Sequence, residues 1–60
     1  MKWSELRRIA EKHGWYLWRS GSRHDIYLHP EKKGSLEIER HDSQEVKTRL
    51  FYKLKKQIGF

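Results

Sequence analysis

The sequence predicts a small α+β domain with two layers, in which two helices pack on one face of a three-stranded antiparallel sheet. Apolar residues recur every three or four positions near both ends of the chain, which indicates two amphipathic helices. Between them, short runs of alternating polar and apolar residues are separated by Gly, Ser and Pro, which is typical of strands. With 60 residues and no Cys, the chain is expected to form a single domain, residues 1–60, without disulfides.

The first helix is expected to begin at Ser4, whose hydroxyl suits the N-cap position. Leu6 and Ile9 fall on its apolar face, whereas Arg7 falls among the charged residues of the other faces. Gly14 is expected to end the helix, because glycine readily adopts the left-handed conformation found after a helix.

The first strand is expected at residues 15–19, because the sequence WYLWR is rich in aromatic residues, which favour strands. Apolar side chains point to both faces of this strand. Either both faces are covered, or one face offers aromatic rings to a partner. Residues 20–22 form the predicted turn into a second strand at 23–29, which Pro30 ends.

Residues 30–34 contain Pro and Gly around charged residues, which predicts a hairpin loop. Residues 35–39 alternate between polar and apolar and predict a third strand, with Leu36 and Ile38 facing inward.

The last helix is expected to be capped by Asp42 or Ser43. Apolar residues then repeat every four positions from Val46 to Ile58, and Gly59 is expected to end the helix.

The chain is strongly basic, with 14 Lys and Arg against 8 acidic residues, a net charge of +6 and a pI near 9.9. Such a charge favours a polyanionic partner, either a nucleic acid or an anionic membrane. No apolar run approaches the length of a membrane span, and the first residues lack a signal-peptide core, so we expect a cytoplasmic protein that does not bind membranes. The order helix, three strands, helix also describes the double-stranded RNA-binding domain, a likeness of fold alone.

His24 is the strongest candidate for a catalytic residue, because it stands at the start of a strand directly after a turn. Imidazole changes its charge near neutral pH, so it can accept the proton of a ribose 2′-hydroxyl or give a proton to the departing 5′-oxygen. RNA carries its own nucleophile, and the protein needs only to bind the phosphate and transfer protons. The alternative is a structural histidine that bonds a carbonyl of the turn.

Other polar and basic residues beside the predicted turns and helix ends are candidates for RNA binding: Ser22, Arg23, His29, Arg40, His41 and Lys47. His29 or His41 is also a candidate for a second proton carrier. A metal site built from His24, His29 and His41 would lack the close spacing and the Cys partners that are typical of such sites. We therefore expect neither a metal nor another cofactor.

Several motifs follow one another in order: Ser4-Glu5-Leu6, Gly14-Trp15, Gly21-Ser22-x-His24 with Tyr27, His29-Pro30, Ile38-x-Arg40-His41, Glu45-Val46-Lys47 and Leu54-Lys55-Lys56-Gln57-Ile58-Gly59. Through them the chain resembles the HicA family, the toxin half of bacterial HicAB toxin–antitoxin pairs, over essentially its whole length. Two positions depart from the pattern. Many members have Pro where this chain has Glu39, and many have Gly-Ser-His where this chain inserts Arg23.

The resemblance implies a domain that folds like the double-stranded RNA-binding domain and acts as an mRNA interferase, cleaving RNA without a metal, with the catalytic histidine at His24. It also implies a HicB-type antitoxin that binds the toxin, covers this histidine and represses the operon. We expect a free monomer that forms a hetero-oligomer with the antitoxin. The alternatives are a non-catalytic RNA-binding module, in which His24 is structural, and an interaction protein that does not bind RNA.

Overall fold

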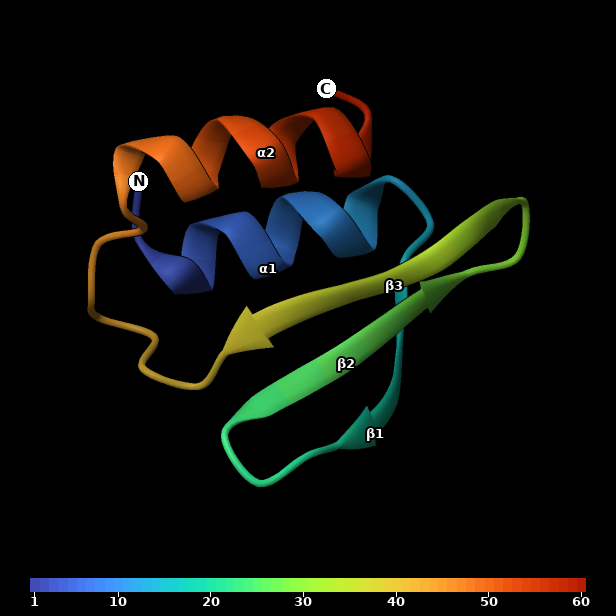
Figure 1. Cartoon of the computed structure of the whole chain (residues 1–60), viewed down its shortest axis with the longest axis horizontal. Coiled ribbons are helices and arrows are strands. Elements are labelled where there is room, and N and C mark those ends of the chain that lie inside the picture. Colours follow the sequence, from blue (N-terminus) through green and yellow to red (C-terminus); the bar gives the residue numbers. More distant parts are fainter.

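The computed structural model describes residues 1–60 and contains two helices and one sheet (Figure 1). In chain order the elements are helix α1 (Trp3–Lys12), strands β1 (Tyr16–Ser20), β2 (His24–His29) and β3 (Lys32–Glu39), and helix α2 (Thr48–Ile58). The strands pair antiparallel in the order β1-β2-β3. The predicted α+β fold is therefore confirmed. Neither helix has the length and apolar character needed to cross a membrane.

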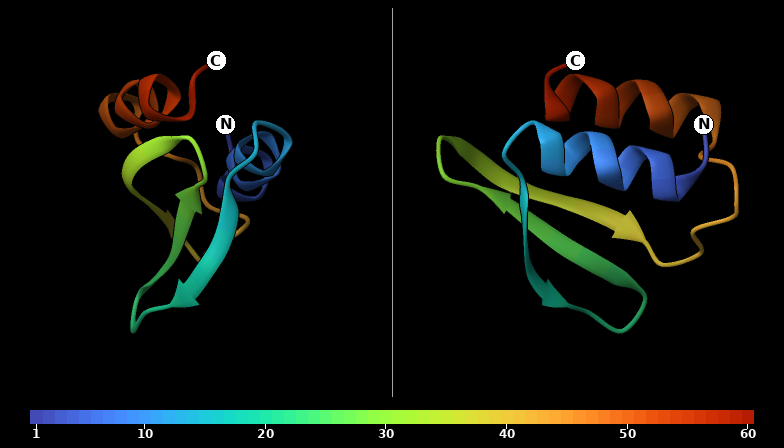
Figure 2. Two further views of the ribbon diagram at one scale, coloured as in Figure 1. Left: turned by 90° about the vertical axis from the view of Figure 1, so that its right-hand side faces the viewer. Right: turned by 180° about the vertical axis from the view of Figure 1, so that it is seen from behind.

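The hydrophobic core lies between the helices and the sheet. Both helices run side by side on the same side of the sheet, and β1 is the strand farthest from α2 (Figure 1 and Figure 2). Leu36 and Ile38 on β3 are fully buried, as their alternation predicts, while Glu37 between them is exposed. The core residues are Trp3, Leu6, Ala10, Trp15, Tyr27, Leu36, Ile38, Val46, Leu54 and Ile58.

The start of α1 differs from the prediction, because the helix begins at Trp3 and Lys2 occupies the N-cap position. The predicted N-cap at Ser4 is wrong. The first amide groups are instead bound by backbone carbonyls of a distant loop: Trp3 donates to Gln44 at 3.0 Å, and Ser4 donates to Asp42 at 3.1 Å. These tertiary hydrogen bonds satisfy the donors for which a side-chain cap was expected.

The start of α2 was also predicted too early, because the helix begins at Thr48 and neither Asp42 nor Ser43 caps it. The loop before the helix is bound to the N-terminal segment, since the amide of Val46 donates to the carbonyl of Met1 at 2.9 Å. Val46 is buried as predicted, although it lies outside the helix.

Strand β3 is longer than predicted, because it begins at Lys32, inside the expected loop 30–34. The loop is reduced to a tight turn, and the Cα pairing of His29 with Lys32 closes the hairpin. Gly34 adopts a φ of 85° within the strand, a conformation that glycine reaches without steric cost. Gly34, which the sequence places in the loop, therefore belongs to an irregular strand.

Strand β1 exposes its side chains along its whole length. Tyr16, Leu17 and Trp18 keep 49%, 50% and 56% of their surface exposed. The pairing with β2 shifts between Leu17 and Arg19, which marks a bulge. The strand is therefore not covered on both faces, and apolar side chains along its whole length are offered to the solvent.

Candidate functional site

His24 is the first residue of β2 and stands at the end of the predicted turn. The amide of Gly21 donates to the carbonyl of His24 at 2.8 Å, and this bond closes the turn. The side chain is half-buried. On β3 its cross-strand partner is Glu39, and side chains in such pairs stand about 4.5–5.5 Å apart at Cβ. The fold therefore presents the imidazole beside a carboxylate.

A polar hollow of about 480 Å³ opens beside His24, and we call it the basic hollow. Its volume falls in the range of about 300–1,000 Å³ typical of small-ligand sites. No apolar residue lines it, and two arginines and a second histidine supply groups that suit a phosphate. The lining residues are Ser22, Arg23, His24, Glu39, Arg40 and His41. Five of the predicted site residues are thus brought together.

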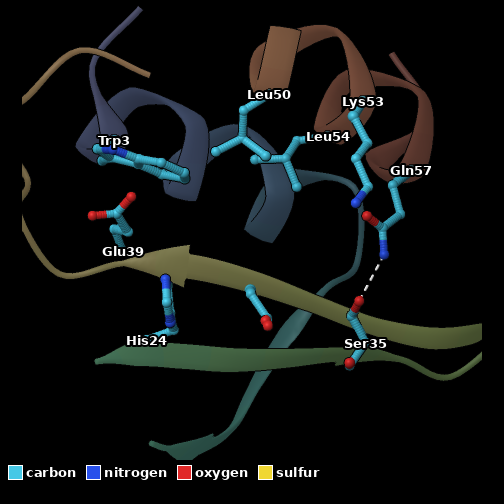
Figure 3. Close-up of a pocket in the computed structure, with 9 residues that line it drawn as sticks. Trp3, His24, Ser35, Glu39, Leu50, Lys53, Leu54 and Gln57 are labelled. Atoms are coloured by element: carbon cyan, nitrogen blue, oxygen red, sulfur yellow. Dashed lines mark hydrogen bonds between the residues drawn. The ribbon is translucent and has the colours of Figure 1, made fainter. Parts of the chain in front are cut away.

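A second hollow, of about 340 Å³, lies between α2 and the sheet, and we call it the α2 hollow. Figure 3 shows His24 rising from the start of β2 toward Glu39, while the Lys53 side chain enters from α2. The side-chain amide of Gln57 donates to the carbonyl of Ser35 at 2.6 Å and joins α2 to β3. The lining residues are Trp3, His24, Ser35, Glu37, Glu39, Leu50, Lys53, Leu54 and Gln57.

A buried carboxylate, Asp25, binds Arg40, which lines the basic hollow. Asp25 is 8% exposed and accepts hydrogen bonds from Arg7 at 2.8 Å and from Arg40 at 3.0 Å. The bond from Arg7 is the main cause that lowers the pKa of Asp25, and the bond from Arg40 adds to it, against an opposing effect of burial. Arg40 also donates to the carbonyl of Gly21. One carboxylate and one arginine thereby tie the His24 turn to the end of β3.

Arg7 is a member of this network that the sequence placed on an exposed face. Its guanidinium also donates to the hydroxyl of Tyr27 at 3.0 Å and to the backbone carbonyl of Glu39 at 3.1 Å. Burial raises the pKa of the Tyr27 hydroxyl, against the opposing effect of Arg7. Arg7 therefore links α1 to β2 and β3, and the prediction that it faces solvent is wrong.

His29 lies at the opposite end of β2 from His24, and does not line the basic hollow. Its Nδ1 accepts the amide of Glu31 at 3.0 Å, so Nε2 carries the proton and donates to the carbonyl of His13 at 2.8 Å. The ring also packs edge-on against Trp15, at 5.3 Å between centroids. These contacts give His29 a structural position, away from the group of predicted site residues.

Lys47 is the N-cap residue of α2 and lies outside the basic hollow. It lines a further hollow together with Glu39, Gln44 and Glu45. No group of three or more His, Asp or Glu side chains stands close enough together to bind a metal ion.

The fold and the site define a small basic α+β domain that presents one histidine at the border of two hollows. Among known families, the one described as the HicA toxin of bacterial toxin–antitoxin systems matches residues 3–60. The chain therefore belongs to the HicA toxin family, and the resemblance seen in its motifs is confirmed. No curated protein matches the chain.

Proposed function

We propose that this protein is the toxin of a bacterial toxin–antitoxin pair and acts as a metal-independent endoribonuclease that cleaves mRNA in the cytoplasm, with His24 transferring a proton. Its growth-inhibiting effect follows from the loss of translatable message. Membership of the HicA toxin family supports the toxin role. The observation that carries the enzymatic part is the position of His24 on the wall of the basic hollow.

The basic hollow supplies the groups that this reaction needs. Arg23 and His41 can bind the phosphate, and Ser22 can donate to one of its oxygens. Cationic groups that are fixed before the substrate arrives stabilise the charge that builds on the phosphorane. Arg40 is held in place by Asp25, so its charge is preorganised at the edge of the hollow. His24 is then the group able to donate or accept a proton at the reacting phosphate.

An antitoxin of the HicB type is the proposed protein partner. It inhibits the toxin by covering His24 and the basic hollow, so that RNA cannot reach them. The free toxin is proposed to be a monomer and to form a hetero-oligomer with the antitoxin. The strongly basic character of the chain, with a net charge of +6, favours an acidic surface on such a partner.

The experiment uses purified protein, a single-stranded RNA of defined sequence and EDTA in the buffer. The wild-type protein is expected to cut the RNA and leave a 2′,3′-cyclic phosphate and a 5′-hydroxyl, and a 2′-deoxy substitution at the cut site should block that cut. His24→Ala should lower the rate by about 10²–10⁴-fold. His13→Ala is the matched control, because it removes an exposed imidazole that lines neither hollow.

The alternative function, a non-catalytic RNA-binding module, gives a different result in the same assay. Such a protein shifts the RNA on a gel without shortening it. Cleavage that is unchanged in His24→Ala would refute the proposed role of His24, and growth arrest by that variant in cells would refute it independently.

A further inference from the structure

Glu39 and His24 form the border between the two hollows of the candidate site. They are Cα partners on neighbouring antiparallel strands. They are also the only two residues that line both the basic hollow and the α2 hollow. An RNA strand that occupies both hollows must therefore pass over this pair.

The Glu39 carboxylate is available for chemistry, because its side chain has no hydrogen-bond or ion-pair partner within the protein. Its backbone, in contrast, is fixed, since Arg7 donates to its carbonyl oxygen at 3.1 Å. The side chain of His24 likewise bonds no other residue, while its carbonyl is bound by the amide of Gly21. The other carboxylate of the site region, Asp25, is occupied by two arginines. Glu39 and His24 thus have backbone groups that are fixed by hydrogen bonds and side chains that are not hydrogen-bonded to other residues.

We propose that Glu39 is the second proton-transfer group of RNA cleavage and acts as the general base, while His24 acts as the general acid. This inference rests on the proposed endoribonuclease function and assigns its remaining role. A carboxylate is a pure proton acceptor when it is ionised, whereas a protonated imidazole is a donor. An in-line displacement needs both groups at once, on different sides of the phosphorus, and the two side chains are not bonded to each other.

The proton balance of the step is complete with these two residues. The Glu39 carboxylate takes the proton of the 2′-hydroxyl, and the 2′-oxygen forms a bond to phosphorus. The bond between phosphorus and the 5′-oxygen breaks, and the His24 imidazolium gives its proton to that oxygen. The products are a 2′,3′-cyclic phosphate and a 5′-hydroxyl, with Glu39 protonated and His24 neutral. Exchange with water restores both groups.

Charged groups from several neighbouring elements lie close to this pair. Cations dominate the basic hollow, and the α2 hollow adds a lysine and a second carboxylate. The ionisable residues that share a hollow with both members of the pair are Arg23, Arg40, His41, Glu37 and Lys53, while Glu45 and Lys47 share a further hollow with Glu39 alone. A phosphate that enters beside Glu39 is therefore attracted by several cations, despite the negative charge of the base.

The first test compares Glu39→Gln with Glu31→Gln. Both variants remove one negative charge, but Glu31 is exposed and lines none of the three hollows near His24 and Glu39. Under single-turnover conditions with saturating RNA, Glu39→Gln should lower the cleavage rate at least about 10²-fold, and Glu31→Gln should change it less than about threefold. Glu39→Asp, which keeps the carboxylate on a shorter side chain, should retain more activity than Glu39→Gln.

Binding separates a catalytic role from an electrostatic one. The affinity for an uncleavable 2′-deoxy RNA should be unchanged or tighter in Glu39→Gln, because a negative charge is lost. If Glu39 only repels the phosphate, the variant will bind more tightly and cleave at least as fast as the wild type, and the proposal is wrong. Circular dichroism should show that the variants are folded, because the replaced side chains have no hydrogen-bond partners within the protein.

A substrate with a bridging 5′-sulfur assigns the two roles individually. Sulfur is a good leaving group that needs no proton, so this substrate should restore most of the rate of His24→Ala but little of the rate of Glu39→Gln. Rescue of Glu39→Gln alone would reverse the assignment and overturn it. If His24→Ala is inactive on normal RNA while Glu39→Gln is fully active, only the role of Glu39 fails. If both variants cleave normal RNA like the wild type, the roles of both residues fail, whereas the proposed function itself fails if the wild-type protein does not cleave RNA.

Discussion

Replacing Asp25 with Asn should strongly destabilise the protein, because this carboxylate joins three elements of the fold. Asp25 on β2 accepts from Arg7 on α1 at 2.8 Å and from Arg40 after β3 at 3.0 Å. The variant keeps the shape of the side chain but loses its charge. It also replaces one acceptor oxygen by an NH₂ group, which points hydrogens at a guanidinium.

The size of the effect follows from the burial of the groups. Removing one partner of a buried ion pair costs about 3–5 kcal/mol. The side chains of Arg7 and Arg40 keep 20% and 43% exposure, so water compensates part of the loss. We expect the free energy of unfolding to fall by about 2–4 kcal/mol. A domain of 60 residues has a total stability of about 3–9 kcal/mol, so Asp25→Asn should remove a large part of it.

The effect should depend on pH in a defined direction. The pKa of Asp25 is lowered in the folded state, mainly by the hydrogen bond from Arg7. Its stabilisation is therefore complete above the ordinary carboxyl pKa of about 3.9 and is lost as the pH falls through the lowered folded-state value. The difference in stability between wild type and Asp25→Asn should accordingly be full at pH 7 and should narrow below about pH 4.

Urea denaturation followed by circular dichroism at several pH values measures this difference. Asp42→Asn is the matched control, because Asp42 also pairs with Arg7, but at 3.6 Å and with a side chain that is 62% exposed. Such a surface pair should contribute less than about 1 kcal/mol. The reasoning is refuted if the two variants are equally stable, or if the deficit of Asp25→Asn stays constant down to pH 2.

Two further predictions concern two glycines with positive φ and the binding of RNA. Gly14 has a φ of 95°, and a Cβ at this position would lie 2.8 Å from Nε2 of His29, so Gly14→Ala should cost about 2–4 kcal/mol. Gly34 has a φ of 85° and no atom within 4 Å of an added Cβ, so Gly34→Ala should cost only the backbone strain of about 1–2 kcal/mol. If urea denaturation shows the same loss of stability for both variants, the contact with His29 does not contribute to the cost of Gly14→Ala. Arg23→Gln should reduce the salt dependence of binding to single-stranded RNA by about 0.7 in the slope of log K against log salt, measured by fluorescence anisotropy, and an unchanged slope would show that Arg23 makes no phosphate contact.

The order of the elements was predictable because its signals are local. Spacing of apolar residues, strand alternation and the glycines at positions 14 and 59 act within a few residues of one another. The helix starts were not predictable in the same way. The amides of Trp3 and Ser4 donate to carbonyls of the loop before α2. Because this loop is distant in the sequence, no local pattern predicts that it caps the helix.

The site was predictable only in part, for the same reason. The turn and the strand start around His24 are predictable because their signals lie in adjacent residues. The same holds for the Arg40-His41 pair that follows β3. The position of Glu39 opposite His24 depends on the register between two strands. The inward direction of Arg7 depends on how α1 is rotated on the sheet. The sequence did not distinguish His29 from His41, because only the fold brings both ring nitrogens of His29 to backbone groups.

The unequal burial of the three tryptophans provides built-in optical reporters. Trp3 and Trp15 are 3% and 2% exposed, whereas Trp18 on β1 is 56% exposed. The emission of Trp3 and Trp15 should shift to longer wavelength only when the core unfolds. Trp18 has the Arg19 guanidinium 5.2 Å from its ring, and its emission should change when a molecule binds near β1. In Trp18→Phe the fluorescence reports unfolding alone. Comparison of that variant with the wild type then allows the docking of RNA or of a protein partner near β1 to be followed without an added dye.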